Sequence, residues 1–184
     1  MKKIIVTGIC AAVIGVLVYF AAITITFIPG VAALYPAAAF ESAFGAWFGI
    51  WGALASYLGL LTAGTAGGWF AGPNGLVLAL SDFIQALAPM IAVRYFRLDP
   101  ELPNWRHAAS YVLVSLLLGS LPGSLIYNYI NLQLGVLAGW NSFWVAVIAW
   151  NTGNFILFIL IGIPVLRYGT RIVKRADLYV SKVY

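Results

Sequence analysis

The chain has 184 residues, of which 63% are hydrophobic and 8% are charged, and its formal net charge is +5. Soluble domains carry about 25% charged residues, so this composition excludes a soluble globular protein and predicts an integral membrane protein. A basic excess in such a protein is typical of cytoplasmic loops and of contact with the lipid bilayer, and we do not expect a nucleic-acid partner.

Six apolar segments predict an all-α fold with six transmembrane helices in a single domain. A spanning helix needs about 20 apolar residues, and the first segment is also too long for the hydrophobic part of a signal peptide. Pro122 is expected to kink the fifth helix. The predicted spans are residues 4–28, 31–48, 50–66, 76–96, 108–134 and 142–166.

The positions of the basic residues test this division. All ten Lys and Arg residues fall within residues 2–3, 94–106 and 167–182. With six spans these three groups lie on one side of the membrane, and the positive-inside rule makes that side, with both termini, cytoplasmic. Five or seven spans would place one group on the opposite side.

Polar side chains inside the apolar spans mark candidate binding residues. Glu41 and Asp82 are carboxylates at positions where an unpaired charge is costly, which is typical of functional sites. Gln85 follows Asp82 by three residues and shares its helical face. Because such groups come from four spans at a similar depth, we predict a cavity that is open to the outside. The predicted substrate-binding residues are Glu41, Asp82, Gln85, Tyr127, Asn128, Trp150, Asn151 and Asn154.

These residues also have structural interpretations. Amides on membrane helices often hydrogen-bond neighbouring helices, Asp82 could cap or pair within the fold, and Glu41 could reach the surface if its span begins at Pro36. Their common depth favours a binding site. Since no Lys or Arg lies at that depth, the substrate is expected to be a neutral or cationic small molecule.

The sequence gives little support to catalysis. Its one histidine, His107, lies in the basic loop, far from the carboxylates, and its one cysteine, Cys10, lies in an apolar span. No Gly-rich phosphate-binding motif of the ATPase type occurs. We therefore expect no enzyme activity, no metal site and no cofactor.

Small residues recur at helical spacing in the first span. Gly8 pairs with Ala12, and Ala11 pairs with Gly15, each four residues apart. Such pairs allow another helix to approach closely, so these residues are predicted to dock a partner or to pack within the chain.

The segment 48–59 reads Phe-Gly-Ile-Trp-Gly-Ala-Leu-Ala-Ser-Tyr-Leu-Gly. Together with the six spans it resembles the S component of energy-coupling factor (ECF) transporters, which carries a Phe-Gly…Gly-Ala-Leu run at the junction of its second and third helices. The resemblance implies a subunit of a prokaryotic plasma membrane that binds a vitamin-like molecule from outside. Separate transmembrane coupling and ATPase subunits would then drive its release inside, and the coupling subunit would dock near Ala11 and Gly15. The N-terminal Met-His signature of the nickel and cobalt members is absent.

Two other functions stay open at this point. One is a membrane sensor or scaffold domain. The other is a small channel or carrier in which Glu41 and Asp82 relay ions or protons.

Overall fold

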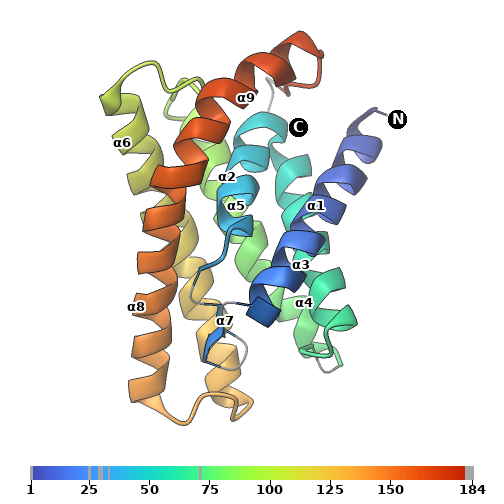
Figure 1. Cartoon of the computed structure of the whole chain (residues 1–184), viewed down its shortest axis with the longest axis vertical. Coiled ribbons are helices and arrows are strands. Elements are labelled where there is room, and N and C mark those ends of the chain that lie inside the picture. Colours follow the sequence, from blue (N-terminus) through green and yellow to red (C-terminus); the bar gives the residue numbers. More distant parts are fainter. Residues whose placement is uncertain (1, 25, 29–30, 33, 71, 181–184) are drawn as a thin grey trace.

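The computed structural model describes residues 2–24, 26–28, 31–32, 34–70 and 72–180, which form a predominantly helical bundle (Figure 1). The strands β1 and β2 form one short antiparallel pair. In chain order the elements are α1 (Lys2–Thr24), β1 (Thr26–Ile28), β2 (Val31–Ala32), α2 (Ala37–Phe48), α3 (Ile50–Ala66), α4 (Asn74–Leu78), α5 (Leu80–Arg94), α6 (Trp105–Val114), the π-helical η1 (Ser115–Ser120), α7 (Leu121–Gln133), α8 (Trp140–Leu157), the π-helical η2 (Phe158–Gly162) and α9 (Ile163–Arg175).

These elements run up and down the long axis of the bundle, which confirms the predicted helical fold class. α1, α3 and the helix α6–η1–α7 run in one direction, while α2, α4–α5 and α8–η2–α9 run back (Figure 1). Within the described residues four helices are long and apolar enough to cross a membrane, and α3 is a shorter apolar helix. The four are Lys2–Ala21, Asn74–Arg94, Trp105–Gln133 and Trp140–Arg175.

The predicted bounds of the first two spans are wrong. Helix α1 ends at Thr24, and the segment Thr26–Ile28, which was assigned to the span 4–28, is a strand. Helix α2 begins only after Pro36, because proline has no N–H to donate and fits the start of a helix better than its interior. Its 12 residues cover about 18 Å, less than the about 30 Å of a bilayer core. Residues 29–30 and 33 of these two spans lie outside the described residues.

Prolines shape the two longest helices in the same way. The π-helical segment η1 ends directly before α7, whose first turn holds Pro122, and η2 ends directly before α9, whose first turn holds Pro164. A widened turn accommodates the ring and the missing N–H of proline without ending the helix. The last helix therefore continues to Arg175, well beyond the predicted end of its span at residue 166.

One end of the bundle is held together by charged side chains. Glu101, in the loop before α6, accepts hydrogen bonds from Lys174 at 2.7 Å and from Arg171 at 3.2 Å. Lys2 at the start of α1 pairs with Asp177 at 3.3 Å. These contacts bring the starts of α1 and α6 and the end of α9 to one basic end, as the distribution of charges predicts.

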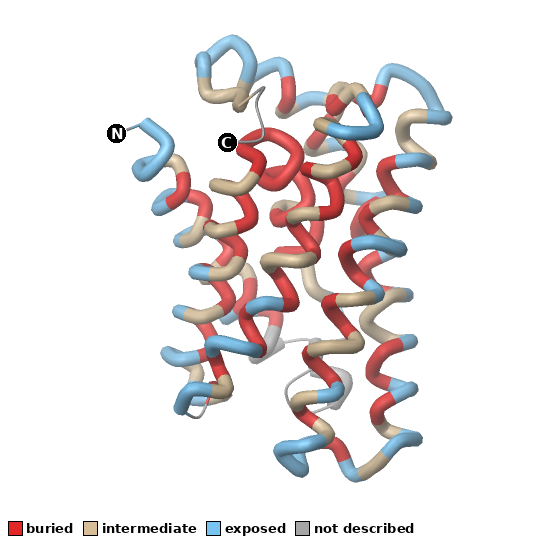
Figure 2. Tube along the Cα trace, turned by 180° about the vertical axis from the view of Figure 1, so that it is seen from behind, coloured by how far each residue is buried: buried red, intermediate tan, exposed pale blue. Residues whose placement is uncertain are grey.

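The segment after α9 folds back over this basic end. The Val180 N–H donates to the carbonyl oxygen of Trp47 at 2.9 Å. The Arg94 guanidinium donates to the Tyr179 hydroxyl at 3.1 Å and to the Val180 carbonyl oxygen. The tail thereby covers the ends of α2 and α5, the two helices whose inner faces are most completely buried (Figure 2).

Glycine allows α2 and α5 to touch through their backbones. A Cβ atom on Gly45 would lie 1.9 Å from the carbonyl oxygen of Ala86. No side chain fits in that space, so the two helices approach more closely than packed side chains permit. This contact lies one turn of α2 beyond Glu41 and one residue along α5 from Gln85.

The two small-residue pairs predicted on α1 have different surroundings in the structure. A Cβ on Gly15 would lie 3.4 Å from the carbonyl oxygen of Gly59, and a Cβ on Gly59 would lie 2.9 Å from that of Ala11. Ala11 and Gly15 therefore face α3, which agrees with the alternative that this pair packs within the chain, and their docking of a coupling subunit stays a prediction. Gly8 and Ala12 are exposed, and their role in docking stays a prediction.

Substituting Gly45→Ala is expected to lower the free energy of unfolding by about 1–3 kcal/mol or more, because the new methyl group overlaps a backbone oxygen. The measurement is the thermal unfolding midpoint of the purified protein in detergent. Gly8→Ala is the matched control, since no atom lies within 4 Å of the position a Cβ would take there. Equal midpoints for the two variants would contradict the close α2–α5 contact.

Lowering the pH is expected to weaken the Glu101 contacts. Hydrogen bonds from Lys174 and Arg171 hold the pKa of Glu101 below its ordinary value of 4.5. A lowered pKa stabilises the fold at pH values above the ordinary pKa, and this contribution is lost as the pH falls through the folded-state value. Glu101→Gln should therefore unfold at a lower temperature than the parent near pH 7, with a difference that closes as the pH falls below 4.5 and through the lowered pKa of folded Glu101. A difference in unfolding temperature that does not change with pH would contradict the stabilising role of the ionised Glu101 side chain.

Candidate functional site

Two buried carboxylates meet at one tyrosine hydroxyl in the middle of the bundle. The Tyr35 hydroxyl lies 2.6 Å from Asp82 Oδ2 and 3.1 Å from Glu41 Oε1. Ser81 Oγ donates to the other Asp82 oxygen at 3.3 Å. Both carboxylates are 0% exposed. Tyr35 lies just before α2, so the chain between β2 and α2 takes part in the site directly.

A chain of amides connects these carboxylates to the far side of the bundle. Gln85 Nε2 donates to Glu41 Oε2 at 2.6 Å. Gln85 Oε1 accepts from Asn154 Nδ2 at 2.7 Å and from Trp150 Nε1 at 3.4 Å. Asn154 Nδ2 also donates to Ser120 Oγ at 2.9 Å. One continuous network therefore joins α2, α5, η1 and α8.

A second cluster of polar side chains lies between α7 and α8. Asn151 Nδ2 donates to Ser124 Oγ at 2.8 Å, and Asn128 Nδ2 donates to the Ser124 carbonyl oxygen at 2.8 Å. The Asn128 Oδ1 atom is buried and has no hydrogen-bond partner among the described residues. Buried polar atoms without a partner are rare, because each costs the free energy of its lost hydration.

Aromatic rings form one side of the carboxylate cluster. The Trp150 ring centroid lies 6.1 Å from that of Tyr35 and 5.2 Å from that of Tyr127. These distances are typical of packed aromatic pairs. Aromatic rings have an electron-rich face and an electropositive edge.

The structure brings the predicted binding residues together at the centre of the bundle. Five of them belong to the carboxylate–amide network, Tyr127 packs on Trp150, and the other two meet at Ser124. The five are Glu41, Asp82, Gln85, Trp150 and Asn154. The predicted open cavity differs from what is seen, since the carboxylates are bonded to neighbouring side chains and closed to solvent. Their role in binding stays a prediction.

Several members of the site were not identified from the sequence. Ser120 and Ser124 were not predicted, although they recur every four residues with the predicted Asn128 along one helical stripe, and this spacing was a usable signal. Tyr35 had no such signal, because it lies outside any regular helix and reaches Asp82 across 47 positions of the chain.

The charge of the cluster is not balanced by basic side chains. No Lys or Arg occurs from residue 4 to 93 or from 107 to 166. The hydrogen bonds that the carboxylates receive come from neutral groups, namely Tyr35, Ser81 and Gln85. Burying two carboxylates without a cation is costly, so this arrangement favours binding of a positive charge or of a polar group that donates hydrogen bonds.

No protein-family model, curated protein or solved structure matches this chain. Within the described residues, no group of three or more His, Cys, Asp and Glu side chains is placed to hold a metal ion. The chemistry of the centre is that of carboxylates, amides and aromatic rings.

Substituting Tyr35→Phe is expected to lower the free energy of unfolding by about 1–3 kcal/mol, because two buried acceptors lose their common donor. The unfolding midpoint in detergent measures the effect. Tyr129→Phe is the control, since Tyr129 is 47% exposed and lies outside the cluster. If both variants unfold at the same temperature, the Tyr35 hydroxyl does not hold the carboxylates together.

Proposed function

We propose that this chain is the membrane-embedded binding subunit of an uptake system for a small, water-soluble, neutral or cationic molecule. Separate transmembrane coupling and ATPase subunits would supply the energy. The observation that supports this most directly is the buried network of Glu41, Asp82, Gln85 and Asn154, which gathers polar groups from separate helices where a bilayer would otherwise require apolar ones.

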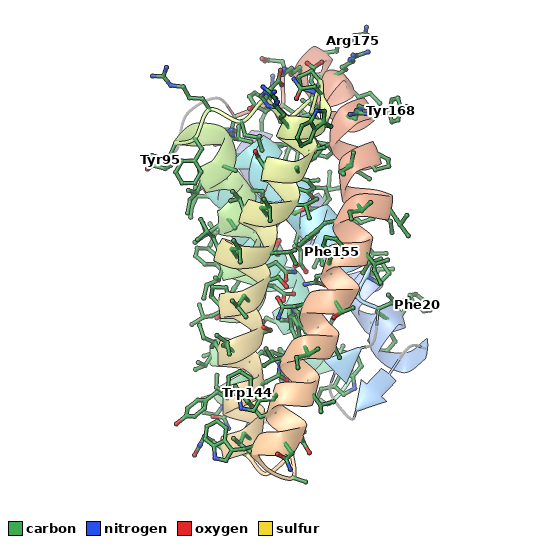
Figure 3. All side chains as sticks on the ribbon, turned by 90° about the vertical axis from the view of Figure 1, so that its left-hand side faces the viewer. Phe20, Tyr95, Trp144, Phe155, Tyr168 and Arg175 are labelled. Carbon is green, nitrogen blue, oxygen red and sulfur yellow. The ribbon has the colours of Figure 1, made fainter. Side chains whose placement is uncertain are left out.

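The surface of the bundle supports its placement in a membrane. Figure 3 shows Tyr95 and Tyr168 toward the basic end and Trp144 toward the opposite end, with Phe155 between them. All four are exposed. Aromatic side chains near both ends of an apolar flank are typical of the two membrane interfaces. In this proposal the bundle spans the plasma membrane of a prokaryotic cell with six helices, and the basic end is cytoplasmic.

The chemistry of the cluster favours a cationic ligand over an anionic one. An ammonium group could displace the Tyr35 hydroxyl and bond to Glu41 and Asp82 together. The rings of Tyr127 and Trp150 would contact the apolar part or the positive charge of the same molecule. The unpartnered Asn128 Oδ1 offers a further acceptor to a ligand that donates hydrogen bonds.

Entry of a ligand requires the cluster to open. The segment that carries Tyr35 is not part of a helix, and its hydroxyl contacts both carboxylates. Movement of this segment away from α5 would expose Glu41 and Asp82 at the end opposite the basic one. The proposed cycle is therefore a change of access to a fixed site and involves no covalent chemistry.

Asp82→Asn and Glu41→Gln are each expected to lower occupancy by a co-purifying small molecule at least about ten-fold, because each removes a charge-assisted hydrogen bond of about 1.5–3 kcal/mol. Native mass spectrometry of the purified protein measures the occupancy. Asp99→Asn is the control, since it removes a carboxylate in the loop before α6. Equal occupancy in all three variants would contradict the proposed site.

A channel or carrier for protons is a second candidate, favoured by the hydroxyl that bridges two carboxylates. Such a bridge is a suitable relay for a proton. Reconstituted liposomes with an internal pH dye distinguish the two functions. Proton entry that depends on Glu41 and Asp82 without any organic ligand supports the relay, and its absence in a protein that retains a ligand supports the binding subunit.

A further inference from the structure

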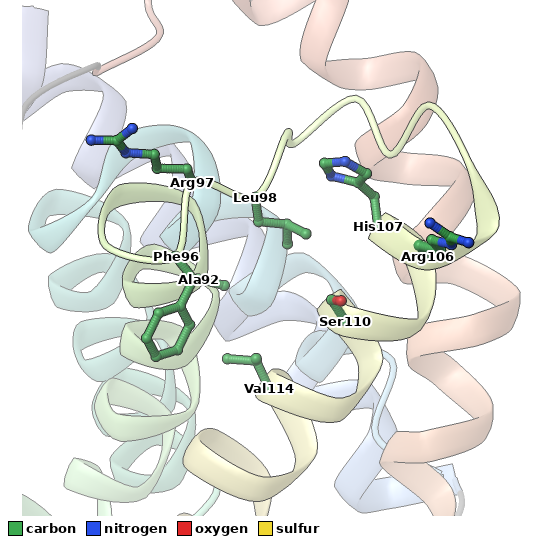
Figure 4. Close-up of a pocket in the computed structure, with 8 residues that line it drawn as sticks. All are labelled: Ala92, Phe96, Arg97, Leu98, Arg106, His107, Ser110 and Val114. Carbon is green, nitrogen blue, oxygen red and sulfur yellow. The ribbon is translucent and has the colours of Figure 1, made fainter.

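A second site lies at the basic end, well separated from the buried carboxylates. A pocket of about 290 Å³ opens between the end of α5 and the start of α6 (Figure 4). Its floor is apolar and its mouth is basic. The residues that carry the argument are Ala92, Leu98 and Val114 in the walls, and Arg97, Arg106 and His107 at the mouth.

The two arginines at the mouth are not neutralised by the protein. Among the described residues, neither the Arg97 nor the Arg106 side chain has an ion-pair or hydrogen-bond partner. The nearby acids offset only part of this charge. Glu101 accepts hydrogen bonds from two cations of α9, and the Asp99 carboxylate, whose Oδ1 accepts the Glu101 N–H at 2.9 Å, is one negative charge against two arginines. The pocket is therefore positively charged and favours an anion.

The two arginines lie on opposite sides of the pocket mouth. Figure 4 shows Leu98 and Ser110 between them and the two guanidinium groups directed away from each other, so both side chains must turn to contact one ligand. Guanidinium groups on long side chains can turn toward an anion and bind its oxygens in pairs. Ser110 adds a hydroxyl donor at the same place.

The surroundings of the pocket indicate the level of a membrane interface. Phe96 lines it and is 63% exposed, and Trp105, whose ring centroid lies 5.8 Å from the Arg106 guanidinium, is 74% exposed. Farther along the same helix, Leu113 and Leu117 are also exposed, so an apolar surface begins where the basic one ends. This order, from basic side chains through aromatic rings to leucines, matches the order from headgroup to acyl chain in a lipid.

We propose that this pocket binds the headgroup phosphate of an anionic phospholipid from the cytoplasmic leaflet. Arg97, Arg106 and Ser110 bind the phosphate oxygens, and the acyl chains lie along Leu113 and Leu117. A soluble phosphate would gain the charge contacts but would leave the apolar walls and the leucines unused. The proposal shares with the proposed function only the placement in a membrane.

The test is a titration of the full chain in detergent with phosphatidylglycerol, followed by native mass spectrometry. Phosphatidylcholine serves as the zwitterionic reference. Arg97→Gln and Arg106→Gln are each expected to weaken phosphatidylglycerol binding about five-fold, the effect of one basic residue near a membrane surface. Arg175→Gln, which removes an exposed charge at the same end but outside the pocket, should leave binding unchanged. If all three variants weaken phosphatidylglycerol binding equally, the lipid is attracted by the overall positive charge of this end, and the proposed site is wrong.

Two further measurements separate the possible outcomes. Inorganic phosphate at millimolar concentration should not displace the lipid, and displacement would show a site for soluble anions instead. Asp82→Asn should retain phosphatidylglycerol binding even where it loses the small-molecule ligand, so failure of one proposal is distinguishable from failure of the other. The unfolding midpoint of each arginine variant confirms that it is folded.

Discussion

The hydroxyl of Tyr35, shared by Glu41 and Asp82, is the interaction on which the centre of the structure depends. Two carboxylates on different helices repel each other when both are charged, and no basic side chain lies near them in the sequence. The Tyr35 hydroxyl is a neutral donor within hydrogen-bonding distance of both, and its one proton is shared between them without bringing in a cation. It also fixes where α2 begins, because Tyr35 must reach Asp82 before the chain turns into the helix at Ala37.

The close contact of α2 with α5 follows from the same requirement. Glu41 receives a hydrogen bond from Gln85 at 2.6 Å, one turn of α2 away from the place where the two backbones touch. Gly45 provides that proximity against Ala86. From Gln85 the network passes to α8 through Asn154, so one tight helix pair sets the geometry of the whole polar centre.

The sequence predicted which residues make up this centre better than it predicted how they contact one another. Carboxylates and amides in apolar segments are costly unless they meet, which is why Glu41, Asp82 and Asn154 were expected together. Helix rotation and long-range contacts leave no periodic signal, so the part played by Tyr35 was not predicted, and the choice between docking and internal packing for Gly15 stayed open. The early end of α1 and late start of α2 were missed for a related reason, since apolar β-branched residues fit a strand as well as a spanning helix.

The two ends of the bundle are closed by different interactions, and this difference bears on how a ligand would enter. The basic end is fastened by Arg94, which holds the folded-back tail, and by the contacts of Glu101 with α9. Opening it requires several charged contacts to break together. At the other end, Tyr35 contacts Asp82 and Glu41 through its hydroxyl and packs on Trp150 through its ring. A ligand that replaces that hydroxyl would offset the loss with its own hydrogen bonds, so we propose entry past Tyr35. In the proposed function, release toward the basic end would then need energy from outside the chain.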